Sequence, residues 1–411
     1  PYAERDEEWI ELYNRGASTI DLSTWNINGG ISSNFPTGTM LGSGDYLVVA
    51  RDATALAQKY PGISIVGDYS GSLGNGGDHL VLKDGRGNPA DEITYFDGGK
   101  WHGKADGGGS SLELLDPDAD NSTATAWAPS DESARSGWNS YTYEDVAVSD
   151  GIGNNIYHEF LIALLDSGEF LLDDVSVIEN GSTEMIQNGD FESDTLGSGA
   201  DKWRALGTHG SHGRTVVVTD PDSPGNQCLH IVATGPTGDK HNKLETTFDN
   251  SERVTAGAIY RISFRAKFLS GSNQVNTRLY FNYLQRTTTI PTSEIWGTPG
   301  TLNSTALGNS GPTLKALAHA PVVPDANQAV NVAIDAVDPD GINDLTLFYS
   351  INGGAFRSSP MAAGPDGIRH VGAIPGQPAS RIVRFYVRAR DSANATTFYP
   401  AAGPQGLSLI H

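Results

Sequence analysis

Residues 74–97 read GNGGDHLVLKDGRGNPADEITYFD, and this stretch decides the fold class. Two short runs, DHLVLKD and DEITYFD, are rich in aliphatic, β-branched and aromatic residues. The glycine-rich clusters GNGGD and DGRGN precede and separate them. Short apolar runs bounded by Gly, Asn, Asp and Pro are typical of β-strands joined by turns. The stretch therefore predicts strands and not a helix.

Short apolar runs separated by turn residues continue through the whole chain of 411 residues, which has 49 glycines, 21 prolines and only 18% charged residues. No segment places apolar residues at i, i+3, i+4 and i+7 over several turns, and the best helical candidate is the short run 52–59. A chain of this length divides into about two to four cores. We expect an all-β protein with three sandwich domains in tandem.

Charge and cysteine content exclude several classes of function. The formal net charge of −22 opposes nucleic-acid binding, which needs a basic surface. The single cysteine, Cys228 in NQCLHIVA, has no partner for an internal disulfide and is predicted to be a buried, inert thiol. No apolar run is long enough to span a membrane, and no signal peptide is visible. We interpret both chain ends as cuts in a longer polypeptide.

Four stretches within residues 1–130 occur in a specific order: DEEWIELYNRGASTIDLSTWNI, GDYLVVARD, LGNGGDHLVLKDGRGNPADEITY and SSLELLDPDADNSTATAWAPS. Together they resemble a bacterial lamin-tail domain. This resemblance implies an immunoglobulin-like sandwich and a module of extracellular multidomain proteins. The strand that usually precedes the acidic turn in that family is absent, which agrees with a cut at the N-terminus.

Residues 131–290 contain longer amphipathic strands and resemble a carbohydrate-binding-module jelly roll. Two motifs carry this resemblance: IQNGDFES, which opens the domain in that family, and FLLDDVSVIE, which closes it. Here the closing motif comes first. A circular permutation explains this order, because a short link, NGSTEM, can join the neighbouring first and last strands of a jelly roll. This hypothesis requires residues 138–179 to pair with strands that follow Glu184.

A linker, 291–319, separates the jelly roll from the last domain. Its WGTPGTLNS is similar to the tail that often follows lamin-tail domains, so we interpret the jelly roll as an insertion relative to that tail. Residues 320–411 contain runs in which apolar and polar residues alternate, and they include an Asn-Gly-Gly sequence typical of a hairpin turn. They resemble the immunoglobulin- or fibronectin-like domains found beside spore-coat-type kinase domains in secreted bacterial proteins. No kinase-like set of lysine, glutamate and metal-binding aspartate is present.

Calcium is the predicted structural ion. In the resembled jelly rolls an ion ties the opening motif to the closing strand, which implies Glu192 and Asp173 as ligands here, with Asp190 and Asp174 nearby. Three further acidic loops are candidate ion sites or ordinary turns: DPDADN (Asp116, Asp118, Asp120), DPDSPGN (Asp220, Asp222) and DPDGIND (Asp338, Asp340, Asp344). Because these loops lack an EF-hand glycine and glutamate, and Asp-Pro and Asp-Gly favour turns, the turn interpretation is preferred.

A glycan surface is predicted on the jelly roll. In YRISFRAKF and RLYFNYL, polar residues alternate with apolar ones, which places basic, aromatic and amide groups on one sheet face. Tyr280 would stack on a sugar, Asn282 would bind hydroxyls, and Arg261, Arg265 and Arg278 would pair with uronate or sulfate groups. A solvated face, or one covered by a neighbouring domain, is the alternative.

These patterns favour a non-catalytic binding or adhesion segment of a secreted or cell-surface bacterial protein. The expected partner is a polysaccharide or cell-surface glycan, with acidic glycans among the candidates, and protein assembly contacts are an open alternative. No G-x-S-x-G or phosphate-binding loop is present. We therefore expect no enzyme in this chain. The second class of function is a structural spacer in an extracellular assembly or surface layer.

Overall fold

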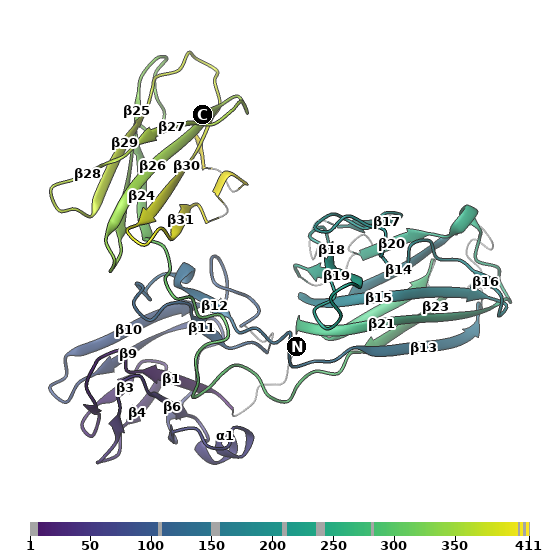
Figure 1. The fold of residues 1–411 in the computed structure, drawn as a ribbon, viewed down its shortest axis with the longest axis horizontal. Coiled ribbons are helices and arrows are strands. Elements are labelled where there is room, and N and C mark those ends of the chain that lie inside the picture. The colour runs from purple at the N-terminus through teal and green to yellow at the C-terminus, as the bar shows by residue number, and fades with distance from the viewer. Residues whose placement is uncertain are drawn as a thin grey trace. The chain divides into compact units, whose positions relative to one another are not determined.

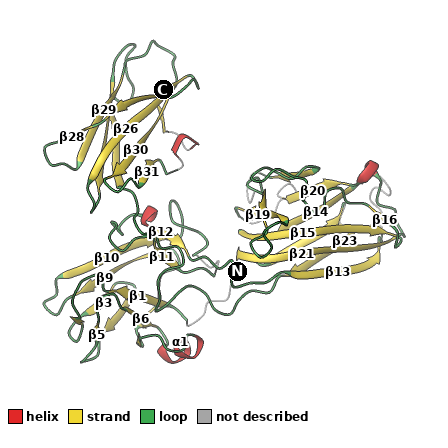
Figure 2. Ribbon diagram, in the orientation of Figure 1, coloured by secondary structure: helices red, strands yellow, loops and turns green. Residues whose placement is uncertain are grey.

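A computed structural model describes residues 7–105, 109–148, 157–207, 212–235, 243–280, 283–401, 403–405 and 408–410. The fold is almost entirely β, with one short α-helix and three 3-10 turns, η1 (Ala124–Ala126), η2 (Asp249–Ser251) and η3 (Gly403–Gln405), among the described residues (Figures 1 and 2). The predicted fold class is therefore confirmed. None of the described helices is long and apolar enough to cross a membrane.

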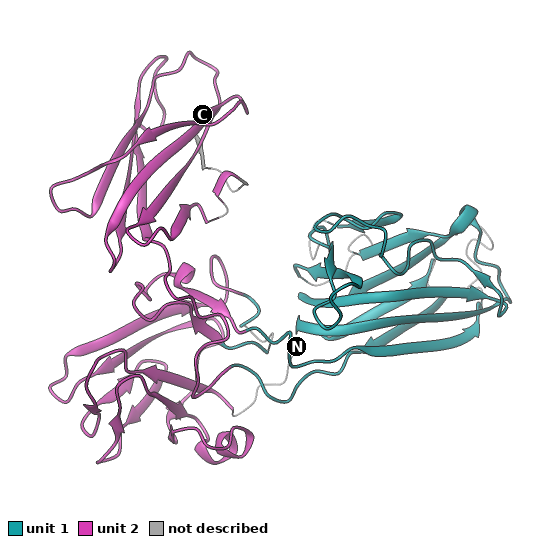
Figure 3. Ribbon diagram, viewed as in Figure 1, with its two compact units in different colours: residues 1–3, 103–111, 131–297 teal, residues 4–102, 112–130, 298–411 magenta. Residues whose placement is uncertain are grey.

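The chain divides into two compact units, one formed by residues 1–3, 103–111 and 131–297, and one by residues 4–102, 112–130 and 298–411 (Figure 3). Residues 131–297 thus interrupt the second unit in sequence. The two ends of this insertion meet, because the Gly297 amide donates to Glu132 Oε1 at 2.8 Å and the Arg135 guanidinium donates to the Gly297 carbonyl. The insertion therefore extends seven residues beyond its predicted end at residue 290.

The first sandwich contains β1 to β12. Their bounds are β1 (Trp9–Tyr13), β2 (Ile20–Asp21), β3 (Asn26–Asn28), β4 (Ile31–Asn34), β5 (Met40–Leu41), β6 (Tyr46–Ala50), β7 (Ile65–Val66), β8 (Ser70–Gly71), β9 (Gly77–Lys83), β10 (Pro89–Phe96), β11 (Leu112–Leu114) and β12 (Trp127–Pro129). The sheets are β10-β9-β3-β4-β8, β1-β6-β7, β11-β12 and β2-β5. The stretch that opened the sequence argument forms the β9–β10 hairpin. Asp84 shapes its turn by accepting hydrogen bonds from the amides of Arg86 and Asn88.

The predicted helix is α1 (Ala53–Lys59). The Asp52 side chain caps it by accepting a hydrogen bond from the Ala55 amide at 2.8 Å, and Leu56 is buried beneath it. The helix ends at Tyr60, before the proline and glycine that terminate the run in the sequence. The sequence interpretation of residues 52–59 is confirmed.

The first sandwich is completed by residues 298–307, which we call the tail segment. The Asn303 side chain donates to the Leu114 carbonyl at 2.9 Å, and the Leu307 amide donates to the Leu115 carbonyl at 2.7 Å. Ser304 Oγ donates to Glu113 Oε2 at 2.7 Å. The tail segment therefore binds along β11 and the residue after it, although the whole insertion separates the two in sequence.

The second sandwich contains β13 to β23. Their bounds are β13 (Asn139–Val146), β14 (Glu159–Leu164), β15 (Gly168–Glu179), β16 (Thr183–Glu184), β17 (Trp203–Leu206), β18 (Val216–Thr219), β19 (Gln227–Ala233), β20 (Lys243–Thr247), β21 (Ile259–Gly271), β22 (Gln274–Leu279) and β23 (Tyr283–Thr289). One sheet has the order β13-β21-β15-β19-β18, with β16 on β15, and the other has the order β17-β20-β14-β22-β23.

Strands from both sides of the link NGSTEM are paired within these two sheets. β13 pairs with β21, β14 pairs with β20 and β22, and β15 pairs with β19 and β21. Phe160 and Phe170, which precede the link, share one core with Phe191 and Phe264, which follow it. The pairing that the permutation hypothesis requires is therefore confirmed.

The third sandwich contains β24 to β32. Their bounds are β24 (Thr313–Ala320), β25 (Val330–Val337), β26 (Ile342–Ile351), β27 (Arg357–Pro360), β28 (Ala362–Ala363), β29 (Arg369–Ile374), β30 (Val383–Asp391), β31 (Thr396–Tyr399) and β32 (Ser408–Ile410). Its sheets are β24-β25-β29-β28 and β27-β26-β30-β31, with β32 on β30. The predicted hairpin turn joins β26 to β27, where Asn352 and Gly353 both have positive φ angles of 51° and 75°. The sandwich begins at Thr313, within the predicted linker.

One buried ion pair fastens an acidic loop onto β21. Lys267 is only 1% exposed, and its Nζ contacts both Asp222 carboxylate oxygens, at 2.9 and 2.8 Å. Asp220 in the same loop accepts a hydrogen bond from the Trp138 indole at 3.0 Å. The loop of residues 220–226 therefore covers part of a strand that the sequence predicted to present basic groups openly.

We predict that Asp222→Ala destabilises the second sandwich by about 2 kcal/mol, because it leaves a buried ammonium group without its counter-ion. Lys267→Met should destabilise it less, because Asp222 is 49% exposed and remains hydrated. The measurement is urea unfolding followed through hydrogen exchange of the β21 amides. Asp201→Ala, which removes an exposed pair with Lys202, is the matched control. Equal losses in the Asp222 and Lys267 variants would contradict this prediction.

Candidate functional site

The residues predicted to bind a glycan are divided between the two sheets of the second sandwich. Arg261 and Arg265 lie on β21, in the six-stranded sheet, whereas Arg278 lies on β22 and Tyr280 follows it, in the five-stranded sheet. Asn282 lies outside the described residues. The prediction that β21 and β22 contribute to a single face is wrong. Alternation shows which residues share one side of a strand, but not which sheet that strand joins.

The Arg265 side chain is held by aromatic and acidic neighbours. Its guanidinium lies 4.7 Å from the centre of the Trp138 ring, and Nη1 contacts Asp174 Oδ2 at 3.1 Å and Asp173 Oδ2 at 3.4 Å. Arg261 is paired in register with Glu144 of β13. In the structure, Arg265 therefore belongs to an ion-pair cluster instead of an open binding surface.

A row of side chains crosses four strands of the five-stranded sheet on the side away from the core. Arg204, Glu245, Leu161 and Arg278 are in register across β17, β20, β14 and β22, and we call them the outer row. Glu245 Oε1 accepts hydrogen bonds from Arg204 Nε at 3.1 Å and Nη2 at 3.0 Å. Lys243 Nζ approaches Glu245 Oε2 at 3.3 Å. The outer row thus combines fixed cations, a carboxylate and an apolar centre.

Tyr280 lies beside the outer row and is packed on two sides. Its ring meets the edge of Tyr157 at a centroid distance of 4.7 Å, and Lys243 Nζ lies 5.0 Å from its centre. Leu161 is 1% exposed although it points away from the core, so neighbouring side chains lie over it. Burial lowers the pKa of Arg278. Tyr280 is therefore part of a layered polar and aromatic surface and not an isolated stacking platform.

Sequence reasoning singled out Arg278 and Tyr280 but missed Arg204 and Tyr157. Arg204 lies on a four-residue strand, and Tyr157 precedes β14, so neither occurs in a long alternating run. Only strand pairing brings them to the same surface. Lys243 and Glu245 alternate with apolar residues in HNKLETTF, but the sequence does not show their neighbours across the sheet.

The four predicted calcium ligands are near one another but do not converge. The opening motif does meet the closing strand, because the Val175 amide donates to the Gly189 carbonyl at 2.9 Å. Asp173, however, accepts a hydrogen bond from Asn226 Nδ2, and Glu192 accepts one from the Gln227 amide. Asp190 is exposed, and Asp174 pairs with Arg265. These carboxylates form no group of three whose oxygens lie within 4.8 Å of one another in the described part of the chain.

Such a group does occur in the third sandwich, where oxygens of Asp338, Asp340 and Asp391 all lie within 4.8 Å of one another. Asp391 is fully buried, and its carboxylate accepts hydrogen bonds from Asn309 Nδ2 and the Ala395 amide, both at 2.8 Å. Burial, together with the neighbouring Asp391 and Asp340 carboxylates, raises the pKa of Asp338. In the described ranges, no Lys, Arg or His forms an ion pair with these three aspartates. The arrangement suits a hard cation such as calcium.

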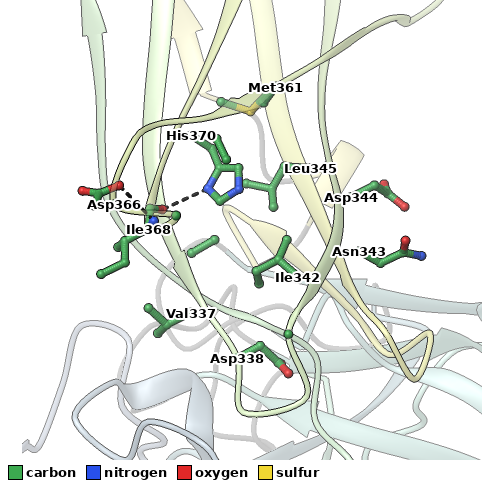
Figure 4. A pocket seen from close by; sticks show the side chains of 14 residues that line it. Val337, Asp338, Ile342, Asn343, Asp344, Leu345, Met361, Asp366, Ile368 and His370 are labelled. Atoms are coloured by element: carbon green, nitrogen blue, oxygen red, sulfur yellow. Dashed lines mark hydrogen bonds between the residues drawn. The ribbon is translucent and has the colours of Figure 1, made fainter.

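Asp338 also lines a cavity of about 510 Å³ between the ends of β25, β26 and β29 (Figure 4). His370 Nδ1 lies 2.9 Å from the Ile368 carbonyl there, and Asp366 accepts hydrogen bonds from two amides of its own turn. Asp344, also on the cavity wall, is paired with Arg388 and Arg390. His370, Asp366 and Asp344 on the cavity wall therefore already have local partners.

Comparisons with known proteins agree with the architecture of the first sandwich. Residues 1–97 match the family model of the Lamin Tail Domain, an immunoglobulin-like fold. A search of curated proteins finds no match. Among solved structures, a marsupial T cell receptor matches with 11% identity over 64% of this chain and 95% of its own, with a TM-score of 0.14. That TM-score is too low to support a structural argument, and the match to a known family concerns residues 1–97.

We predict that Cys228 does not react with a thiol reagent in the native protein at pH 8. Its side chain is fully buried, and burial, with smaller contributions from Asp220 and Asp173, raises its pKa to about 12. Ellman's reagent should detect the thiol only after denaturation. Rapid reaction of the native protein would show that β19 opens readily.

Proposed function

We propose that this chain is a non-catalytic binding segment of a secreted or cell-surface bacterial protein, and that the inserted second sandwich binds a polysaccharide. The observation that carries this proposal is the outer row with Tyr280 beside it. Guanidinium groups recognise uronate and sulfate oxygens through paired hydrogen bonds, and tyrosine edges and faces contact sugar rings. The immunoglobulin-like first sandwich is consistent with a binding or structural segment.

The topology of the insertion supports a display role. Its first and last residues are joined through Glu132 and Gly297, so a folded domain leaves and rejoins the chain at one place. A domain attached in this way can be exchanged or elaborated without disturbing the sandwich that carries it. In this proposal the first sandwich is the scaffold, and the second sandwich is the ligand-binding module.

A structural spacer or assembly subunit is the second candidate function. It is favoured by the ion pairs of Arg204 and Arg265, which occupy cations that a glycan would otherwise bind. The partial burial of Tyr280 favours it too. The two functions differ in one observable property, which is the retention of the protein by acidic polysaccharides.

We predict that Arg278→Ala and Tyr280→Ala each weaken polysaccharide binding by about tenfold, the effect of losing one charge-assisted hydrogen bond or one ring contact. Arg261→Ala is the matched control, because it removes the same side chain from the other sheet. The measurement is affinity electrophoresis in gels that contain uronate-rich or sulfated polysaccharides. If the parent protein is retained by none of them, the spacer function replaces this proposal.

Calcium is the second part of the proposal. Three carboxylates with converging oxygens and no cationic partner repel one another, and a divalent cation would relieve that repulsion. The group includes β25–β26 turn residues and the end of β30, so an ion there would join two segments of the third sandwich. Calcium is therefore expected to be structural.

We predict that calcium raises the melting temperature of the parent protein by several degrees through mass action, and that a chelator reverses this. Asp340→Asn should abolish the response, whereas Asp325→Asn, at an exposed position of the same sandwich, should keep it. The measurement is differential scanning calorimetry. A response lost instead in the Asp173→Ala, Glu192→Ala double variant would place the ion in the second sandwich. No response in the parent protein would remove calcium from the proposal.

A further inference from the structure

Small residues leave one end of the third sandwich's core unfilled. Ala336 of β25, Ala363 of β28, and the glycines Gly341 and Gly367 in the segments before β26 and β29 line the cavity there. Its volume of about 510 Å³ lies within the range of roughly 300 to 1,000 Å³ that is usual for small-ligand sites. The cavity is therefore large enough to hold a ligand.

One buried side chain of the cavity keeps an available acceptor. His370 is 5% exposed, and its Nδ1 lies 2.9 Å from the Ile368 carbonyl. Because a carbonyl oxygen only accepts, Nδ1 carries the proton, and Nε2 of the neutral ring is an acceptor. Within the described residues, nothing donates a hydrogen bond to Nε2. Figure 4 shows the imidazole among Met361, Leu345 and Ile342, so this acceptor lies in an apolar part of the cavity.

Two carboxylates of the wall each keep one oxygen available. Asp366 uses Oδ1 to accept the amides of Ile368 and Arg369, and Asp338 uses Oδ1 to accept the Asp340 amide. In the described ranges, neither Oδ2 takes part in a hydrogen bond. The bonds from the Arg369 and Ile368 amides lower the pKa of Asp366, which therefore stays ionised at neutral pH.

The charges and the aliphatic wall of the cavity select an organic cation. None of the described residues that line the cavity is Lys or Arg. Asp344 is neutralised from outside the lining, because Arg388 and Arg390 occupy its two oxygens. The uncompensated charge on the wall is thus negative. An ammonium group on an alkyl chain matches this wall, since it donates up to three hydrogen bonds while its stem packs against aliphatic side chains.

We propose that this cavity binds a primary alkylammonium group, supplied by the lysine side chain of a partner protein or by a free amine. The ammonium group donates to the available acceptors of the wall, and the alkyl chain contacts Ile342 and Leu345. Hydrogen bonds from a cation to carboxylates are among the strong ones in proteins, and the apolar surroundings strengthen them. The site requires neither the polysaccharide nor the calcium of the proposed function.

The cavity and the three converging aspartates have Asp338 in common, whereas Asp366 and His370 belong to the cavity alone. A calcium ion on Asp338 would weaken the attraction for an ammonium group. The experiment is therefore carried out in excess chelator, which makes its outcome independent of the calcium proposal. It is independent of the outer row too, because that row belongs to the second sandwich.

The test is ligand-observed saturation-transfer NMR on the full chain at pH 7, with n-pentylamine as the probe. Its neutral and anionic counterparts are n-pentanol and pentanoate. n-Pentylamine should bind at least tenfold more tightly than n-pentanol, and pentanoate should not bind. Nα-Acetyl-lysine N-methylamide distinguishes the sources: affinity equal to that of n-pentylamine indicates a lysine side chain, and binding of n-pentylamine alone indicates a free amine. Equal binding of n-pentylamine and n-pentanol, or binding of neither amine, would overturn the proposal.

Two variants separate binding in the cavity from general attraction to an acidic chain. Asp366→Asn removes the charge but keeps the oxygen that accepts two amides, and it should weaken amine binding by about tenfold. Ala363→Leu, at an exposed position of β28, keeps every charge but fills the cavity and should abolish binding. Asp325→Asn, at an exposed position outside the lining, is the matched control and should bind as the parent does. Calorimetry verifies that the variants are folded, and undiminished binding in either folded cavity variant contradicts the proposal.

Discussion

The burial of Glu113 is the constraint on which the arrangement of this chain depends. A carboxylate removed from water is destabilising unless donors satisfy its oxygens. Here the donors come from Thr298, Ser304 and Thr305, which follow the whole insertion in sequence. The chain must therefore return to β11 after residue 297, and this return requires an insertion whose two ends lie together. The hydrogen bond between Gly297 and Glu132 meets that requirement.

Charged groups in the second sandwich also have polar partners of opposite charge. The chain is strongly acidic, and several cations of this sandwich are engaged by carboxylates: Lys267 by Asp222, Arg265 by Asp173 and Asp174, and Arg204 by Glu245. Such pairs fix loops and strands in register but reduce the number of cations available to a ligand. The three converging aspartates of the third sandwich are the opposite case, since carboxylates meet there without a cationic side chain. The described residues thus include carboxylates paired with cations and a group of three carboxylates that meet without one.

The interpretations of function rest on different kinds of evidence. The lamin-tail match concerns residues 1–97 and indicates a fold and not a ligand. The proposed glycan ligand rests on the chemistry of the outer row, and the proposed display of that ligand rests on the topology of the insertion.

The sequence by itself determined the local elements of this protein. Local patterns predicted the β9–β10 hairpin, the helical run that forms α1 and the hairpin turn at Asn352, because each depends on residues that are neighbours in the chain. The reversed order of two motifs also predicted the permuted pairing of β13 to β15, and the burial of Cys228 followed from its apolar run. The tertiary structure alone decided which sheet each strand joins, and it therefore separated Arg261 from Arg278 and brought Arg204 and Asp391 to their sites. Pairing between distant strands depends on the packing of the whole core, which no local pattern of residues contains.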